Sequence, residues 1–324
     1  MIYNFMHLPI HIRMRILHIE DAAAVACILA KYQNLTQGFE SKVVKLDRYD
    51  KFGFYKFYKD YVKVTTSEDL FLSAILEGAE KADIIHVHSK VELVPYLRNK
   101  YGKSKKIVLH YHGTDIRGLK KQKLPHRSRI SDTAIRLIYL YRRIRNNVLL
   151  KKRIHSKVQS LSDLTIVSTP DLLQYVSSKR GIKKIYLPNP IDSDLFNPDI
   201  ISSINSNDSL HAEAVTMDTE VTDMSWVHNY LKMNRINFDI DVYDRIKHPL
   251  MYSELPRFLK RYRIYVDIRY VDGKILTNLS KTGLEALACG LDVLDFDLKF
   301  RHGLPFEHCP LTVVSQLSEE YAKL

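Results

Sequence analysis

Short apolar runs alternate with helix-length segments along most of this chain, and this alternation restricts the fold more than any other feature. In the first part of the chain, runs rich in Ile, Val and Leu occupy residues 15–19, 42–46, 84–88, 107–111, 164–167 and 184–187. Helix-length segments lie between these runs, at residues 22–36, 69–79 and 131–152. Strands that alternate with helices predict a parallel sheet with helices on both faces.

A second and shorter alternation follows. Pro188 and Pro190 close the first part in a way that is typical of a defined hinge, and the Ser- and Asn-rich residues 200–210 indicate a linker. Further strands are predicted at residues 212–217, 238–242, 264–268, 292–296 and 311–314, and helices at residues 223–233, 253–261, 282–289 and 317–323. We therefore predict an α/β fold with two Rossmann-like parallel-sheet domains that face a cleft. The domains are residues 14–192 and a reduced unit at residues 211–324, with residues 193–210 as the linker.

The composition fits this organisation. A chain of 324 residues, 45% of them hydrophobic, is long enough for about two domains with ordinary cores. Cys27, Cys289 and Cys309 are an odd number at scattered positions, which argues against a disulfide framework and favours a reducing compartment. No apolar run approaches the roughly 18 residues that span a bilayer, and residues 1–13 lack a signal-peptide cleavage pattern. The predicted location is therefore cytoplasmic.

Residues 280–294 have the pattern of a nucleotide-binding helix in an open α/β sheet. Gly283 lies at the start of the helix, Glu285 lies in its first turn, and Gly290 ends it before a strand. Free backbone N–H groups at a helix start can hold a diphosphate. A carboxylate in the first turn can accept hydrogen bonds from ribose hydroxyls.

A second candidate site lies where residues 107–111 end. Residues 112–115 are His-Gly-Thr-Asp, and Gly113 allows the backbone to turn close to a ligand. His110 and His112 share a strand face because side chains alternate along a strand. His112 alone fits a structural strand-end residue as well as a ligand-binding one, and Asp115 is a further binding candidate in this turn.

Six segments, in their order and spacing, resemble glycosyltransferases of the GT-B fold, specifically the retaining glycosyltransferase family 4 group. They are residues 14–19, 82–88, 112–115, 162–169, 187–192 and 283–294. The resemblance implies transfer of a sugar from a nucleotide-diphosphate donor with retained anomeric configuration and without a metal or other cofactor. It implies that His112 lies beside the donor sugar, that Gly283 and Leu284 offer amides to the phosphates, and that Glu285 binds the ribose. Asn189 and Asp192 would belong to the hinge.

The chain also departs from the family pattern. Thr277 stands where the family carries a second Glu near the sugar, and the Gly-Arg and Lys that neutralise the diphosphate are absent after residue 210. Residues 20–24, Glu-Asp-Ala-Ala-Ala, replace a Gly-rich turn. A diphosphate leaving group needs positive charge. Our hypothesis is that Arg269, Lys274 and Lys281 supply it, although solvated loop charges explain these residues equally well.

The positive charge of the chain is concentrated in one segment. Residues 117–157 carry 14 Lys and Arg against one acidic residue, Asp132, so this segment has a net charge of +13 where the whole chain has +12. Apolar residues within it follow helical spacing. Two interpretations remain open: docking on an anionic membrane near a lipid-linked acceptor, or a packed helix with a solvated basic face. Nucleic acid is not an expected partner, because no nucleic-acid-binding module is visible.

Two alternatives concern metal and activity. His86 and His88 share one strand face, as do His110 and His112, and these four side chains could ligate Zn²⁺ if their strands are neighbours. The family resemblance explains both pairs without a metal, so we predict none. For function, we predict a glycosyltransferase acting on a glycan or lipid-linked acceptor. A module that binds nucleotide sugar or glycan without transfer, and a sugar-nucleotide epimerase, are the alternatives.

Overall fold

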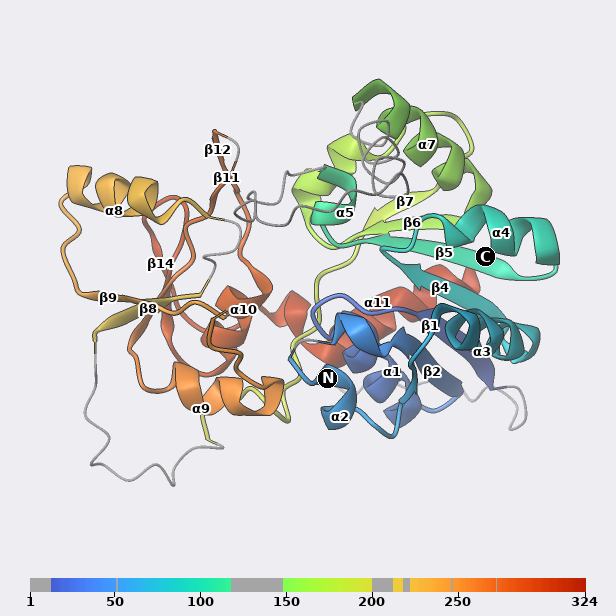
Figure 1. The fold of residues 1–324 in the computed structure, drawn as a ribbon, viewed down its shortest axis with the longest axis horizontal. Coiled ribbons are helices and arrows are strands. Elements are labelled where there is room, and N and C mark those ends of the chain that lie inside the picture. The colour runs from blue at the N-terminus through green and yellow to red at the C-terminus, as the bar shows by residue number, and fades with distance from the viewer. Residues whose placement is uncertain are drawn as a thin grey trace, which may run out of the picture.

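The structure is a computed structural model that describes residues 13–50, 52–117, 148–199, 212–217, 222–245, 247–271 and 273–324. Its two β-sheet units lie side by side (Figure 1). The predicted helix at residues 131–152, most of the basic segment and the predicted linker at residues 200–210 lie outside the described residues.

The first unit is built on a seven-stranded sheet in the order β3-β2-β1-β4-β5-β6-β7, in which every neighbouring pair is parallel. The strands are β1 (Met14–Ile19), β2 (Phe39–Leu46), β3 (Val62–Thr65), β4 (Ile84–His88), β5 (Lys106–Tyr111), β6 (Leu164–Val167) and β7 (Lys184–Tyr186). All residues of β4 and β6 are buried, as expected of strands covered on both faces. Six of these strands confirm the predicted runs, and the short β3 at the sheet edge is the one that the sequence did not indicate.

Helices cover both faces of this sheet, so its apolar strands are buried on both sides. One buried cluster joins the sheet to α1 (Val25–Leu35), and the other joins it to α3 (Glu68–Lys81), α4 (Leu93–Tyr101) and α7 (Val148–Leu161). Two short helices, α2 (Phe54–Phe57) and α5 (Thr114–Arg117), lie in the connections. The chain adds strands on one side of β1 as far as β3 and then on the other side from β4 to β7, so the strand order changes direction between β1 and β4. Open α/β sheets bind ligands at the carboxyl ends of the strands beside such a point.

The second unit is a smaller sheet with the order β14-β13-β10-β8-β9. Its strands are β8 (Ala214–Thr216), β9 (Ile240–Val242), β10 (Ile264–Val266), β13 (Asp292–Leu294) and β14 (Phe300–Arg301), and only the β13–β14 pair is antiparallel. A separate hairpin pairs β11 (Tyr270–Val271) with β12 (Lys274–Ile275). The expected α/β fold, two Rossmann-like sheets of which the C-terminal one is reduced, is confirmed.

Three helices surround the second sheet: α8 (Met224–Met233), α9 (Leu255–Leu259) and α10 (Lys281–Ala288). Side chains cap two of them, since Asp223 accepts a hydrogen bond from the amide of Trp226 and Ser280 accepts one from the amide of Gly283. Such N-caps satisfy donors that a helix start leaves without intrahelical partners.

The last helix, α11 (Pro310–Ala322), differs from the sequence expectation in its first half. Residues 311–314 were predicted as a strand, but they continue a helix that has Pro310 in its first turn, where proline is well tolerated. The helix also returns to the first unit and packs against α1, as Figure 1 shows in red. This contact is not evident from the sequence, because periodicity does not show where an amphipathic helix docks.

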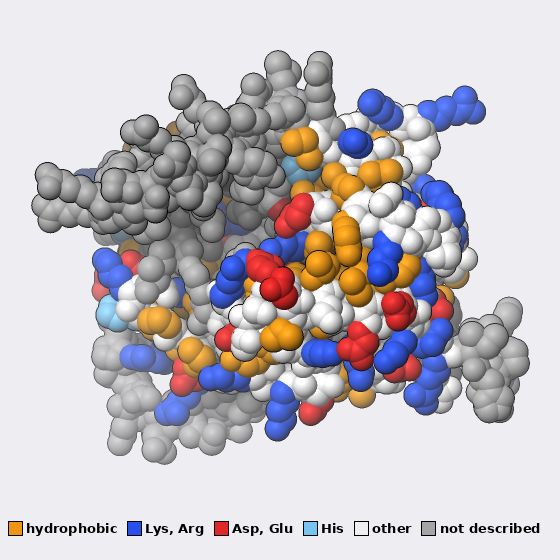
Figure 2. Space-filling view, turned by 45° about the vertical axis from the view of Figure 1, so that its right-hand side comes forward, with side chains coloured by type: hydrophobic (Ala, Val, Ile, Leu, Met, Phe, Trp, Pro, Cys, Tyr) orange, Lys and Arg blue, Asp and Glu red, His pale blue; other side chains and the backbone are white. Residues whose placement is uncertain are grey.

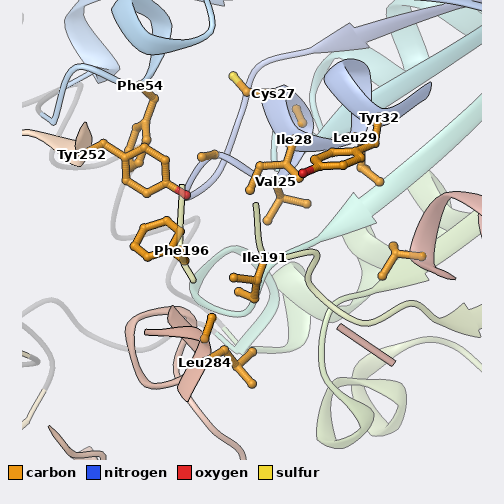
Figure 3. Packing of buried hydrophobic residues seen from close by; sticks show 14 of the residues in the cluster. Val25, Cys27, Ile28, Leu29, Tyr32, Phe54, Ile191, Phe196, Tyr252 and Leu284 are labelled. Atoms are coloured by element: carbon orange, nitrogen blue, oxygen red, sulfur yellow. The ribbon is translucent and has the colours of Figure 1, made fainter. Parts of the chain in front are cut away.

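One continuous core connects the two units. Figure 3 shows Phe54 and Tyr252 in contact, with Phe196 beneath them and Ile191 and Leu284 nearby. The backbone of Tyr252 donates a hydrogen bond to the Phe52 carbonyl at 2.8 Å. The second unit is therefore held against the first by both apolar contacts and main-chain hydrogen bonds.

The turn between β1 and α1 holds three non-glycine residues in the left-handed region. The φ angles of Glu20, Ala23 and Ala24 are 63°, 51° and 63°. A side chain in this conformation costs roughly 1–2 kcal/mol per residue relative to glycine. Residues 20–24 therefore lack the glycines of the family pattern, but three of them keep the backbone conformation that glycine favours.

We expect Ala23→Gly to raise the free energy of unfolding by about 0.5–1 kcal/mol in urea titrations, because relief of strain exceeds the entropy that glycine adds to the unfolded chain. Ala22 does not have a positive φ and is the matched control. Ala22→Gly should lower stability by about 0.4–1 kcal/mol. Equal effects of the two substitutions would contradict the strain argument.

Two surface features bear on membrane binding. Of the described helices, none is long and apolar enough to cross a bilayer. On the face shown in Figure 2, Lys and Arg side chains are interspersed with Asp and Glu. Neither feature tests docking through residues 117–157, most of which lie outside the described residues, so this docking stays a prediction.

Candidate functional site

A cavity of about 230 Å³ lies between the two units. The first unit contributes Asp21, Ala23, Lys45, Phe52 and Phe54, and the second contributes Arg245, Tyr252, Lys281, Thr282 and Glu285. Asp21 follows β1 and Lys45 lies near the end of β2, so the cavity lies at the carboxyl end of the first sheet, where such sheets bind ligands. The lining holds three cationic and two anionic side chains, which suits a ligand with negative charge.

The first half of α10 places a buried ion pair in this cavity. Because the helix begins at Lys281, Glu285 lies one turn into it and not in the first turn, where it was expected. Lys281 Nζ lies 3.4 Å from Glu285 Oε1, and Tyr252 donates a hydrogen bond to the same oxygen at 3.2 Å. Burial lowers the pKa of Lys281 and raises the pKa of Glu285, and each shift is partly offset by the charge of the other group. An anionic ligand beside Lys281 would add an interaction that favours its charged form.

Arg245 is the cation whose hydrogen bonds are incomplete. It follows β9 and stacks over the Phe52 ring, with its guanidinium carbon 4.0 Å from the ring centre. Its Nε and Nη2 atoms are buried and have no hydrogen-bond acceptor among the described residues. Buried donors without acceptors are rare in proteins and often mark a place where a ligand or water binds.

A second group of charges closes the cavity on the first unit. Lys45 lies 3.4 Å from Asp21 and 3.7 Å from Asp50, and all three side chains are almost fully buried. Burial opposes the charged form of Lys45, but the nearby carboxylates outweigh it and raise the pKa of this group. Lys45 therefore has two carboxylate partners within the protein, whereas Lys281 has one, Glu285, and two guanidinium nitrogens of Arg245 have no acceptor among the described residues.

The amides expected to bind a diphosphate already have partners. Gly283 donates to Ser280 Oγ at 2.8 Å, and Leu284 donates to the Ser280 carbonyl at 3.0 Å. An added Cβ at Gly283 would clash with the Asp267 carboxylate, so the close approach of Asp267 explains this glycine. A diphosphate would have to displace the Ser280 cap to reach these amides.

The turn at the carboxyl end of β5 is held by Asp115. Its carboxylate accepts hydrogen bonds from the amides of His112 and Gly113 and from the Ser89 hydroxyl. His112 Nε2 is hydrogen-bonded to His88 Nδ1 at 3.0 Å. The three expected residues of this turn lie together, but none of them is among the residues that line the described cavity.

The remaining candidates lie around the β11–β12 hairpin. Lys274 and Thr277 are exposed, and neither lines the cavity. Arg269 forms an ion pair with Asp267 at 3.2 Å. Of the three cations proposed to replace the missing pair, the structure brings Lys281 alone into this cavity.

Comparisons with known proteins identify similar structures but no family. No family model and no curated protein matches the chain. The similar solved structures include Anabaena HepE in complex with UDP, at 10% identity over 95% of this chain and 91% of that one, with a TM-score of 0.44. Sucrose-phosphate synthase from Thermosynechococcus elongatus is 12% identical over 96% of this chain and 90% of its own, with a TM-score of 0.46. UDP-GlcNAc 2-epimerase from Neisseria meningitidis bound to UDP-GlcNAc is 11% identical over 96% and 92%, with a TM-score of 0.42.

Three cavity residues are not among the sites predicted from the sequence: Arg245, Lys45 and Tyr252. Parallel sheets bind ligands at the carboxyl ends of their strands, and this rule fits both Arg245, which follows β9, and Lys45, which lies near the end of β2. The predicted strands could therefore have identified both. Tyr252 does not directly follow a strand, and its place in the cavity depends on how the two units meet.

Proposed function

We propose that this protein is a glycosyltransferase that binds a nucleotide-diphosphate sugar in the cavity between its two sheets. The observation that carries the proposal is the Arg245 guanidinium, whose buried Nε and Nη2 have no acceptor among the described residues and which lines a cavity shared with Lys281 and Glu285. Diphosphate oxygens would supply the acceptors that Arg245 lacks.

In the proposed complex, Arg245 and Lys281 bind the diphosphate. Lys281 now donates a hydrogen bond to the Pro190 carbonyl at 2.7 Å and forms an ion pair with Glu285. Movement of Lys281 toward a phosphate frees the Glu285 carboxylate to accept hydrogen bonds from ribose hydroxyls. As the bond to the sugar breaks, the two cations stabilise the negative charge that develops on the leaving diphosphate.

Donor binding requires the two units to separate. A cavity of about 230 Å³ is smaller than typical small-molecule sites, which span about 300–1,000 Å³. The Arg245–Phe52 stack and the hydrogen bond from Tyr252 to Phe52 cross the cavity and would open in this motion. Residues 188–192 are the proposed hinge.

The proposal predicts that nucleoside diphosphate binding depends on Arg245. Loss of a charged hydrogen-bond donor costs about 1.5–3 kcal/mol, so Arg245→Gln should weaken binding roughly 10–100-fold in calorimetry with uridine, guanosine and adenosine diphosphates. Lys281→Met should have a similar effect. Lys232→Ala is the matched control, because Lys232 is exposed on α8 and outside the cavity lining, and it should leave the affinity unchanged.

A hydrolysis assay with the corresponding nucleotide sugars then separates transfer from binding. Slow donor hydrolysis supports the enzyme, and an isomerised sugar supports an epimerase. Binding without any turnover supports a module that binds nucleotide sugar without transfer. That second candidate is favoured by the position of His112 and Thr277 outside the cavity lining. Absence of binding to every nucleotide would refute both candidates.

The finer assignments are also proposals. Membership of the retaining glycosyltransferase family 4 group rests on the segments quoted above, and it implies retention of configuration without a cofactor. We propose a glycan or lipid-linked acceptor that enters over the first unit. Residues 117–157 would bind an anionic membrane beside it, which predicts salt-sensitive binding to anionic vesicles and none to neutral ones.

A further inference from the structure

Five histidines form a continuous group on one face of the first sheet. They are His18 on β1, His86 and His88 on β4, His110 on β5, and His112 directly after β5. The parallel register pairs His18 with His86 and His88 with His110, so their side chains point to the same side. The rings lie 4.2–5.3 Å apart between successive members, on the side covered by α1 and α11.

Three of these histidines bring ring nitrogens close enough to share one ion. His18, His86 and His88 each offer a nitrogen that lies within 4.8 Å of the other two. His18 Nδ1 and His88 Nε2 are only 3.0 Å apart. His86 Nε2 is buried and has no hydrogen-bond partner among the described residues.

The opposite nitrogen of each of these rings has a hydrogen-bond partner. His18 Nε2 lies 2.9 Å from Gln33 Oε1, His86 Nδ1 lies 2.6 Å from the Tyr321 hydroxyl, and His88 Nδ1 lies 3.0 Å from His112 Nε2. When each ring donates its proton to that outer partner, the three lone pairs point inward. Histidines that ligate metals are held by outer hydrogen bonds of this kind.

The three rings are buried, with 0% of each exposed to solvent. An ion held between them would be shielded from bulk water, and ligation uses the neutral form of each imidazole.

We propose that His18, His86 and His88 bind a divalent transition-metal ion, of which Zn²⁺ is the natural probe, between the first sheet and helices α1 and α11. Neutral imidazole suits Zn²⁺, and three histidines with a water in the fourth position are an established ligand set for it. The ion would fix the two helices to the sheet, because Gln33 lies on α1 and Tyr321 lies on α11. This role is structural and does not depend on the proposed transferase activity, since none of the three histidines lines the described cavity.

The test uses the full-length chain. The protein is unfolded with chelator, freed of metal, and refolded with or without equimolar Zn²⁺, and bound metal is measured by mass spectrometry. We expect about one ion per chain and a higher melting temperature with Zn²⁺. Less than about a tenth of an ion per chain would overturn the proposal.

Variants locate the ion. His86→Gln should reduce bound Zn²⁺ at least about tenfold, and Gln33→Leu, which keeps all three ligands, should weaken affinity about 10–100-fold. His302 is the matched control, because it is exposed and pairs with Asp292, and His302→Ala should leave the stoichiometry unchanged. Retention of Zn²⁺ by His86→Gln would refute this site.

A measurement on the unmodified chain covers the case in which His86→Gln does not fold. X-ray absorption of the Zn²⁺-loaded protein should show imidazole nitrogens at about 2.0–2.1 Å. A first shell of oxygen atoms without imidazole scattering would identify surface binding and overturn the proposal.

Discussion

Replacing Asp192 by alanine is expected to lower the free energy of unfolding by about 3–5 kcal/mol, because it removes one member of a buried ion pair. The Asp192 side chain is 0% exposed and lies 2.8 Å from Lys31 Nζ. It also accepts hydrogen bonds from the hydroxyls of Tyr32 at 3.0 Å and Tyr58 at 2.8 Å. Alanine would leave the buried Tyr58 hydroxyl without this acceptor and would remove one of the two carboxylates that contact Lys31.

The neighbouring Asp194 provides the control for this experiment. Its carboxylate also contacts Lys31, at 2.7 Å, but its side chain is 65% exposed. Exposed ion pairs contribute little, so Asp194→Ala should cost less than about 1 kcal/mol in the same denaturant titrations. Asp192→Asn, which keeps one carbonyl acceptor, should fall between the two alanine variants. An Asp192→Ala protein as stable as Asp194→Ala would contradict this view of the hinge.

The position of Asp192 links stability to the proposed opening motion. It follows the two prolines of the hinge and attaches that segment to α1 and to Tyr58, which follows α2. On the other side, the Ile191 amide donates to the His308 carbonyl at 3.0 Å, and Lys281 donates to Pro190. The hinge therefore contacts both units, and its attachment to the second unit involves a cation of the proposed donor site.

The sequence predicted the fold well where a strand is buried on both faces. The bounds of β4 and β6 match the predicted runs, because a strand covered twice is a continuous apolar segment. The second half of helix α11 was predicted correctly, whereas edge strand β3 and the first half of α11 were not, for different reasons. β3 is short, and its exposed or half-buried residues include Lys63. The Leu-Thr-Val-Val run of α11 has strand-like composition, although Val313, Val314, Leu317 and Tyr321 are buried at helical spacing.

The candidate site was predicted in part, and the limit has a physical cause. Lys281 and Glu285 were found because a capped helix start has a local sequence pattern. Arg245 belongs to the same cavity but reaches it from another strand end and stacks on a residue of the other unit. The histidine group shows the same limit. The pairs on β4 and β5 follow from alternation, whereas His18 joins them only through the β1–β4 register.

Acidification from pH 6.5 to pH 4 is expected to destabilise the metal-free protein, and His18 alone should account for about 3 kcal/mol. Burial lowers the pKa of His18 from its ordinary 6.5 to about 4, and a difference of one pKa unit corresponds to about 1.4 kcal/mol. In this pH window the unfolded chain binds a proton at His18 that the folded protein does not. The free energy of unfolding therefore falls as the pH falls. The stability that comes from keeping His18 neutral is fully present above pH 6.5 and is lost by about pH 4.

The other buried histidines should steepen this dependence. Burial, followed by the charge of neighbouring rings, holds the pKa of His86, His88 and His110 far below the usual range. Two carboxyl groups act in the opposite direction, because burial raises the pKa of Glu20 and Glu285, so the folded state takes up protons there before the unfolded chain does. The expected slope is therefore positive but smaller than the histidines alone would give.

His18→Gln separates the histidine contribution from general acid unfolding. The free energy of unfolding is measured by urea titration, with chelator present, at several pH values between 6.5 and 4. If His18 remains neutral in the folded protein, the free energy of unfolding should change with pH less steeply in the variant than in the wild type. The difference should be up to about 1.4 kcal/mol per pH unit, which is the effect of one proton bound only by the unfolded chain. An unchanged slope in His18→Gln would mean that His18 binds its proton equally in both states, and the inward-facing lone pair proposed for the metal ion would then be protonated in mild acid.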